Sequence, residues 1–403
     1  MKEMKADGFS LVEAVIATGL MMLVTASVFG MLNPAQGAFA AEPDGADMQQ
    51  RLRVGADTLT RDLVMAGAGA YLGTQAGSLS YYFAPVLPFR QGASNDDPAG
   101  TFATDRITLL SVPSTTAQTT LAVALTGNSP TPTLTLAAET GCPRNPATGL
   151  PYLECGFTKD LSVLIFDDTG NYDMFTITSV TDASAQAVVK RPADSLNTNY
   201  PIGSTIVEAS SHTYYLKTDT ANHLYQLMHY DGTTNADVPV VDHLVRLTFE
   251  YFGEPDPPAL RKPITDPVGP WTSYGPKPPA PGLKPTAYPA GENCTFMLDP
   301  SGAPAPRLAT LGSGGPGLVP LTAAQLTDGP WCPDSTNLNR WDADLLRIRK
   351  IGVTIRVESA SDALRGPASA LFARAGTSRG GNRWVPDQEI RFQVTPRNLS
   401  LGR

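Results

Sequence analysis

The strongest pattern in the chain is an unbroken run of apolar residues near its beginning. From Phe9 to Leu32 the residues are mostly apolar, and the only ionisable side chain among them is Glu13. A helix rises about 1.5 Å per residue, so this run would be about 36 Å long, enough to cross a hydrocarbon core of about 30 Å. The pattern therefore predicts a transmembrane helix at residues 9–32. Lys2 and Lys5, which precede it, favour a cytoplasmic N-terminus.

A helical period continues beyond the apolar run. Pro34 predicts a kink or an interruption of the helix at this point. From about residue 44 to 66, apolar or small residues recur at spacings of three or four and would form one face of an amphipathic helix. These residues are Met48, Leu52, Gly55, Leu59 and Leu63. Gly67 and Gly69 are expected to end the helix, so residues 33–72 read as an amphipathic continuation of the N-terminal helix.

The remainder, residues 73–403, is a series of short apolar segments separated by turn signals. Residues 161–166 predict a buried strand, and a turn at 167–171 leads to a returning strand at 174–180. Further strands are expected at 188–189, 213–216 with 224–227, 245–251, 351–357 and 390–394. The chain is therefore predicted to have an α+β fold with a β-rich C-terminal domain.

Residues 253–335 differ from the rest in composition, because they carry 19 of the 36 prolines. Such a segment disfavours continuous sheet and favours extended loop or polyproline II structure. It lies between two predicted strands, so we interpret it as an insertion into the β domain. Two interpretations stay open: a surface loop displayed for contact with a partner, and a tolerated surface excursion.

Charge and cysteine content limit the possible functions. The formal net charge of −8 gives no indication of a nucleic-acid-binding surface, so no nucleic-acid partner is expected. Four cysteines, an even number on the far side of a membrane, suggest two disulfides. Three pairings are possible, and we expect the local one, which joins Cys142 to Cys155 and Cys294 to Cys332. The cysteines do not show the Cys-x-x-Cys spacing that would indicate a metal site.

No motif for catalysis or for cofactor binding is found in the sequence. The four histidines are His212, His223, His229 and His243, and they show no metalloprotease spacing. Asp167, Thr169, Asn171 and Asp173 are spaced like calcium ligands. A calcium loop would need Gly at 172 and a carboxylate at 178, where the chain has Tyr172 and Thr178, so we predict a turn. The prediction is a protein that is not an enzyme and has no cofactor or metal.

The first residues carry a more specific signal. Gly8, Phe9 and the lone Glu13, followed by the apolar run, resemble the type III signal of type IV pilins and type II secretion pseudopilins. In that family a membrane peptidase cuts after the glycine and methylates the new N-terminal Phe. The resemblance implies a leader at residues 1–8, a methylated Phe9, and a role for Glu13 in assembly, in which its carboxylate pairs with the amine of a neighbouring subunit. It also implies a pilin-like fold, in which the long helix packs on a mainly antiparallel sheet.

Later segments resemble the PilW-like minor pilins. Arg61–Gly67 is similar to their "Arg-Asp-Ile-Arg-x-Ala-Gly-Tyr" segment, although Ala68 replaces the aromatic residue. Thr213–Leu216 and Leu224–Gln226 are similar to their "Tyr-Tyr-Leu … Leu-Tyr-Arg" pair, and Arg397-Asn398 to their final "Arg-Asn". The resemblance implies a minor pilin that primes or caps pilus assembly. Its expected partners are prepilin peptidase, other minor and major pilins, and the inner-membrane assembly platform. The expected location is the inner membrane, single-pass, with the C-terminal domain in the periplasm, and then the pilus or cell surface.

Other interpretations of the N-terminus remain. A minor pseudopilin of type II secretion would carry the same signal. A secretory signal peptide could be cut after Ala38-Phe39-Ala40, which would leave Ala41 at the start of an exported adhesin or enzyme. An ordinary membrane anchor could hold Glu13 near the interface. The apolar run is longer than the usual signal-peptide core of about 7–15 residues, which favours the pilin-type signal.

Overall fold

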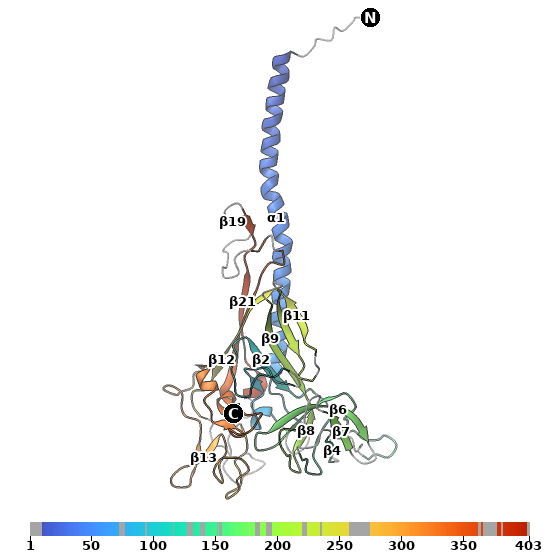
Figure 1. Cartoon of the computed structure of the whole chain (residues 1–403), viewed down its shortest axis with the longest axis vertical. Coiled ribbons are helices and arrows are strands. Elements are labelled where there is room, and N and C mark those ends of the chain that lie inside the picture. The colour runs from blue at the N-terminus through green and yellow to red at the C-terminus, as the bar shows by residue number, and fades with distance from the viewer. Residues whose placement is uncertain are drawn as a thin grey trace. The chain divides into compact units, whose positions relative to one another are not determined.

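A computed structural model describes most of the chain (Figure 1). The described residues are 10–71, 77–92, 95–115, 117–126, 132–137, 142–150, 152, 155–181, 186–190, 196–219, 224–233, 236–257, 275–361, 364–365, 377–379 and 382–400. The chain divides into two units: residues 1–52 with 357–388, and residues 53–356 with 389–403. A mostly antiparallel β domain follows a long N-terminal helix in the chain, so the predicted α+β class is confirmed.

The helix α1 extends from Leu11 to Met65. Its segment Leu11–Met31 is long and apolar enough to cross a membrane, and none of it is buried in the protein. The helix continues through Pro34, so the predicted interruption was wrong. A proline removes one helical hydrogen bond and crowds the preceding turn, a cost of about 3 kcal/mol that did not end this helix.

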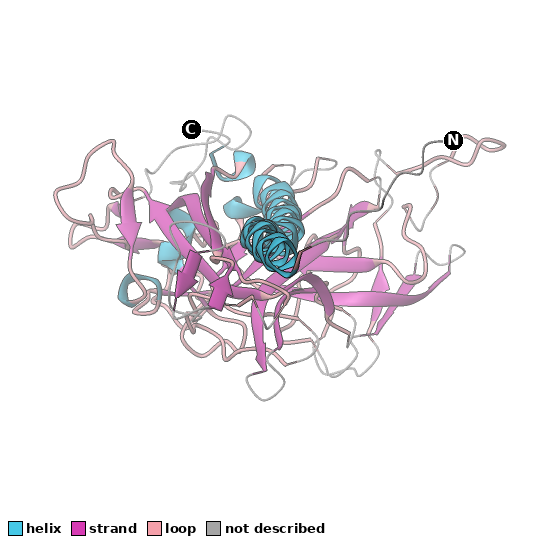
Figure 2. Ribbon diagram, turned by 90° about the horizontal axis from the view of Figure 1, so that it is seen from above, coloured by secondary structure: helices cyan, strands magenta, loops and turns pink. Residues whose placement is uncertain are grey.

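The predicted amphipathic face is buried. Its members are Met48, Leu52, Gly55, Leu59 and Leu63. Figure 2 shows strands beside the helix. Within the second unit, Gly55 gives a measure of how closely the helix and the strands pack. A Cβ on Gly55 would lie 3.4 Å from Ile355 Cδ1 and 3.9 Å from Leu227 Cδ2. The apolar period therefore places the helix directly against the sheets, as predicted.

One sheet holds the predicted hairpin. Its strands, in spatial order, are β1 (Val86–Leu87), β2 (Arg106–Ser111), β9 (Ser210–Asp219), β10 (Leu224–Tyr230) and β11 (Val238–Asp242). Neighbouring strands in it are antiparallel. Tyr214 pairs with His229 across β9 and β10. The hairpin at 213–216 and 224–227 is thus confirmed, with longer strands than predicted.

A second sheet contains the strands that alternation predicted most clearly. Its order is β15 (Val319–Leu321), β12 (Leu244–Gly253), β18 (Ile348–Val357) and β21 (Gln388–Val394). Strand β12 buries Leu247, Phe249 and Tyr251 and exposes the residues between them to a larger degree, as a half-buried strand should. Strand β18 is buried on both faces, whereas Ile390 of β21 is exposed.

A third sheet has its own core. Its order is β3 (Gln118–Thr120), β8 (Thr205–Glu208), β5 (Ser162–Phe166), β6 (Tyr172–Thr181), β7 (Gln186–Lys190) and β4 (Thr133–Thr135). The predicted strands at 161–166, 174–180 and 188–189 all belong to it. The disulfide between Cys142 and Cys155 lies in this core beside Phe157 and Phe175, so the first predicted pairing is confirmed.

The described residues of the proline-rich insertion form more strand structure than predicted. Within it, β13 (Phe296–Leu298) pairs with β14 (Pro304–Pro306), and β16 (Trp331–Cys332) pairs with β17 (Trp341–Asp342), which follows the insertion. It also supplies β15, which pairs with β12 at an edge of the second sheet. The disulfide Cys294–Cys332 closes the insertion and confirms the second predicted pairing. The remaining short elements are η1 (Leu79–Tyr81), η3 (Ala324–Leu326), η4 (Ala343–Arg347), β19 (Thr377–Arg379), β20 (Asn382–Trp384) and η5 (Arg397–Ser400).

Candidate functional site

Of the residues in the predicted processing signal, Glu13 lies at the beginning of α1. Gly8 and Phe9 are outside the described residues. Glu13 is exposed in the first turn of the helix, and its backbone N–H donates to Ser10 Oγ over 3.2 Å. Ser10 is therefore the N-cap, and Ser10 with Glu13 has the spacing of a capping box. The carboxylate also stands at the positive end of the helix dipole, so Glu13 favours helix initiation in the isolated chain.

The opposite end of α1 is closed by residues distant in sequence. Gly67 adopts a positive φ of 80°, and its N–H donates to the carbonyl of Leu110 over 2.9 Å. Asn398 Nδ2 donates to the carbonyl of Met65 over 3.3 Å. Leu399 covers the turn so closely that a Cβ on Gly67 would lie 2.7 Å from its Cδ2. The glycine and the Arg-Asn segment that resemble minor pilins are thus both part of the helix terminus.

A cluster of polar side chains joins the last turns of α1 to β9 and β10. The hydroxyl of Tyr214 donates to Asp62 Oδ2. His212 Nδ1 lies 3.4 Å from the same carboxylate oxygen and 2.9 Å from His229 Nε2. The side chains of Asp62 and His212 are 14% and 29% exposed, so the cluster is partly open to solvent. It brings together three side chains of types that bind metals in proteins.

Burial shifts the pKa of two side chains here, His229 and Tyr214. It lowers the pKa of His229, and the neighbouring His212 lowers it further. Burial and then the carboxylate of Asp62 raise the pKa of Tyr214 well above its ordinary value. His229 is therefore a neutral imidazole with a lone pair available, and Tyr214 remains a hydrogen-bond donor.

Sequence reasoning missed this cluster because no local motif connects its members. The available signal was the register of the hairpin. Tyr214 lies opposite His229, and His212 lies two residues before Tyr214, on the same face of β9. Such diagonal neighbours lie within reach of long side chains. The position of Asp62 depends on how α1 packs on the sheet, which the sequence does not specify.

A second group of acids lies near β17. Asp328, Asp342 and Asp344 bring carboxylate oxygens together, and two of them are buried. Asp342 accepts hydrogen bonds from the N–H groups of Gly329 over 2.7 Å and Asp344 over 2.8 Å. Burial raises the pKa of Asp342 to about 7 and that of Asp344 to about 6. These carboxyls organise local backbone, since their bonds are made to main-chain groups and to Arg347.

The turn at 167–171 has the structure predicted for it. The carboxylate of Asp167 accepts hydrogen bonds from the N–H groups of Thr169 and Asn171 and from both of their side chains. The carboxylate of Asp173 instead accepts from Asn197 and Tyr200. These oxygens are bonded to protein groups in separate networks, as expected for a turn rather than a calcium loop.

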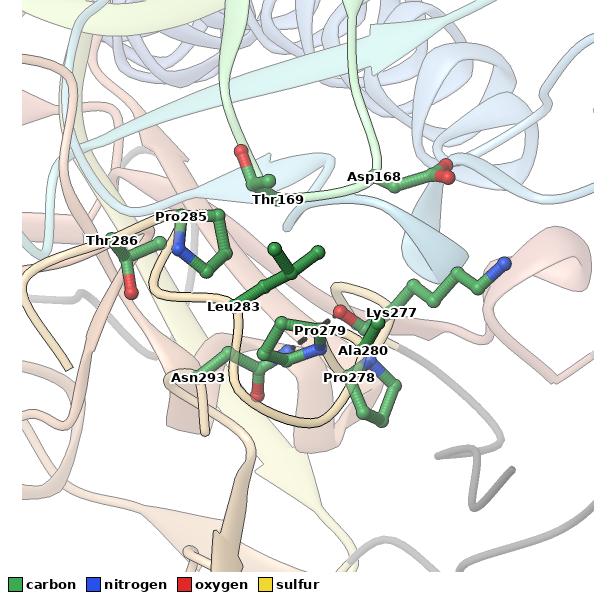
Figure 3. A pocket seen from close by; sticks show the side chains of 10 residues that line it. All are labelled: Asp168, Thr169, Lys277, Pro278, Pro279, Ala280, Leu283, Pro285, Thr286 and Asn293. Atoms are coloured by element: carbon green, nitrogen blue, oxygen red, sulfur yellow. Dashed lines mark hydrogen bonds between the residues drawn. The ribbon is translucent and has the colours of Figure 1, made fainter. Parts of the chain in front are cut away.

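A small pocket separates this turn from the proline-rich insertion (Figure 3). It encloses about 210 Å³, below the range of about 300–1,000 Å³ usual for ligand sites. Asp168 and Thr169 line it on one side, and Pro279 and Leu283 on the other. The side chain of Lys277 extends away from Leu283 in Figure 3. The pocket therefore offers a mainly apolar wall and few converging polar groups.

Comparison with protein-family models, with curated protein sequences and with solved structures finds no match to this chain.

Proposed function

We propose that this protein is a minor subunit of a type IV pilus or a related filament, inserted in the inner membrane and processed between Gly8 and Phe9. The observation that carries the proposal is the order of features at the N-terminus. Glycine, phenylalanine and a lone glutamate precede a helix whose segment Leu11–Met31 is apolar and unburied. The same helix then continues into an amphipathic half that packs on antiparallel strands.

The exposed apolar surface supports an environment other than water for the first half of α1. Side chains on all sides of this segment are exposed, for example Leu11, Leu20 and Phe29 at 83%, 61% and 66%. Burying such a surface in lipid, or against helices of neighbouring subunits, removes it from water. A filament subunit needs both states in turn, first in the membrane and then in the filament.

Glu13 has a specific part in the proposal. A carboxylate in hydrocarbon is unfavourable unless a positive group pairs with it. Processing at Phe9 would create such a group, and the amine of an adjacent subunit could meet Glu13 during assembly. The contact with Ser10 is made by the backbone N–H of Glu13, so a substitution of the side chain does not remove it. Glu13→Gln therefore tests the charge, because glutamine also suits the third helical position but carries no charge.

The direct test is the N-terminus of protein taken from the cell envelope of cells that contain a prepilin peptidase. N-terminal sequencing and intact mass are expected to give a methylated Phe9. Gly8→Val should block cleavage, because a close-fitting peptidase subsite would admit glycine and exclude a branched side chain. Gly19→Val in the same helix is the matched control, since a Cβ there has no neighbour within 4 Å. A mature terminus at Ala41 or Met1 in the parent would overturn the proposal.

A further inference from the structure

Three side chains of types that bind metals meet where the second unit's part of α1 lies against the β9–β10 hairpin. Asp62 comes from the helix, His212 from β9 and His229 from β10. The carboxylate oxygen and the two ring nitrogens all lie within 4.8 Å of one another. The three elements are far apart in sequence, so their convergence is a property of the tertiary fold.

The distances between these atoms fit a shared ion. In a tetrahedral zinc site with ligand bonds of about 2.0–2.1 Å, ligand atoms lie about 3.3 Å from one another. His212 Nδ1 lies 2.9 Å from His229 Nε2 and 3.4 Å from Asp62 Oδ2. These two distances differ from that spacing by a few tenths of an ångström, and the third pair, His229 and Asp62, lies within 4.8 Å.

We propose that Asp62, His212 and His229 bind a divalent transition-metal ion of the Zn²⁺ class, which links α1 to the β9–β10 hairpin. Two imidazoles and one carboxylate are a ligand set that Zn²⁺ accepts, with a fourth position for water. The partial exposure of His212 leaves that position accessible. The inference does not depend on the proposed filament function, because the ion would join elements of one chain.

Groups around the cluster already orient it for coordination. Tyr214 donates its hydroxyl proton to Asp62, the kind of outer hydrogen bond that fixes a metal-binding carboxylate. The ring of Tyr214 lies 5.0 Å from that of His229, centroid to centroid, and limits how far the imidazole can turn. Coordination uses the lone pairs of His212 Nδ1 and His229 Nε2, so the proton of each neutral ring must reside on its other nitrogen.

Metal binding should stabilise the fold, because the three ligands come together only in the folded chain. Free Zn²⁺ at one hundred times its Kd would raise the folding equilibrium constant of the second unit about one hundredfold. The competing explanation is that the two imidazoles share a single N–H···N hydrogen bond with no ion. In that case Zn²⁺ would leave the folding equilibrium unchanged.

The test uses the full chain, purified in detergent and treated with EDTA. Zn²⁺ is titrated in competition with a chromophoric chelator, for the parent and for Asp62→Asn, His229→Gln and Asp57→Asn. Asp62→Asn retains an acceptor for Tyr214 but removes the anionic ligand. Asp57→Asn is the matched control, because Asp57 is exposed on the same helix. One Zn²⁺ per parent chain is expected, with binding weakened at least tenfold in the first two variants and unchanged in the control.

A measurement on the parent chain covers the case in which a variant fails to fold. Zn²⁺ should protect His212 and His229 from acylation by diethyl pyrocarbonate, while His223 and His243 serve as internal references. Peptide mapping gives the extent of modification at each histidine. Equal modification with and without Zn²⁺ would overturn the proposal, as would a binding curve that Asp62→Asn and His229→Gln leave unaltered.

Discussion

Gly67 at the end of α1 is a position where one added methyl group should have a large effect. A non-glycine residue in the left-handed region costs about 1–2 kcal/mol. Gly67→Ala would also place Cβ 2.7 Å from Leu399 Cδ2 and 3.2 Å from Pro85 Cγ. Overpacking of this kind costs about 1–3 kcal/mol. The expected loss in free energy of unfolding is therefore about 2–5 kcal/mol.

A second glycine separates the two contributions. Gly203 has a φ of 87°, close to the 80° of Gly67, but a Cβ there would meet no atom within 4 Å. Gly203→Ala should therefore cost only the backbone contribution of about 1–2 kcal/mol. The difference between the two variants measures the collision with Leu399.

The assay is urea unfolding of the full chain in detergent, followed by tryptophan fluorescence, for the parent and both glycine variants. Leu399→Ala, alone and together with Gly67→Ala, completes a double-mutant cycle. The combined loss should be smaller than the sum of the single losses by about 1–3 kcal/mol, because truncation of Leu399 removes the collision. Equal losses for the two glycine variants, or additivity within about 0.5 kcal/mol, would refute the reasoning.

Three further predictions concern other parts of the molecule. Glu13→Ala should be inserted and cleaved but fail to enter filaments, and Glu13→Gln should be less severely affected. Equal ratios of filament-bound to membrane-bound protein for the parent and the variants would contradict this. Replacing Cys294 and Cys332 with alanine, which opens a loop with a sequence separation of 38, should cost about 4 kcal/mol in unfolding under non-reducing conditions, and an unchanged urea midpoint would argue against it. Burial raises the pKa of Asp342 from 3.8 to about 7, so its contribution to stability is complete below pH 3.8 and is lost as the pH rises towards 7. Between about pH 4 and 7 the parent should therefore lose stability relative to Asp342→Asn by up to about 1.4 kcal/mol per pH unit, and parallel pH profiles would exclude this.

The sequence predicted best the elements whose pattern reflects a single interface. The face of α1 that includes Leu59 and Leu63 is buried, and the residues between these two are less buried, so its period of three and four was readable. Strand β12 alternates for the same reason. Strand β18 was predicted from alternation too, yet both of its faces are buried, because polar residues such as Thr354 are also buried within the second sheet.

The elements that sequence reasoning missed depend on contacts between distant segments. Strand β15 contains Pro320, and the proline-rich composition of its segment argued against a sheet. The strand lies at the edge of the second sheet. An edge strand can contain proline, because the missing N–H can face away from the neighbouring strand. The cluster of Asp62, His212 and His229 needed the hairpin register and the position of the helix on the sheet. No spacing along the chain contains that information, because each ligand is in a different element.

The hydrogen bond from Asn398 to Met65 spans 333 positions of the chain. During synthesis, the end of α1 would therefore emerge long before the side chains that close it. Until η5 arrives, the turn at Gly67 lacks the cover of Leu399. Long-range closures of this kind slow folding, since loop entropy is lost before the contact compensates for it. A chain that ends before η5 would therefore leave the turn at Gly67 uncovered, so the end of α1 is expected to become stable only once residues 397–400 have been made.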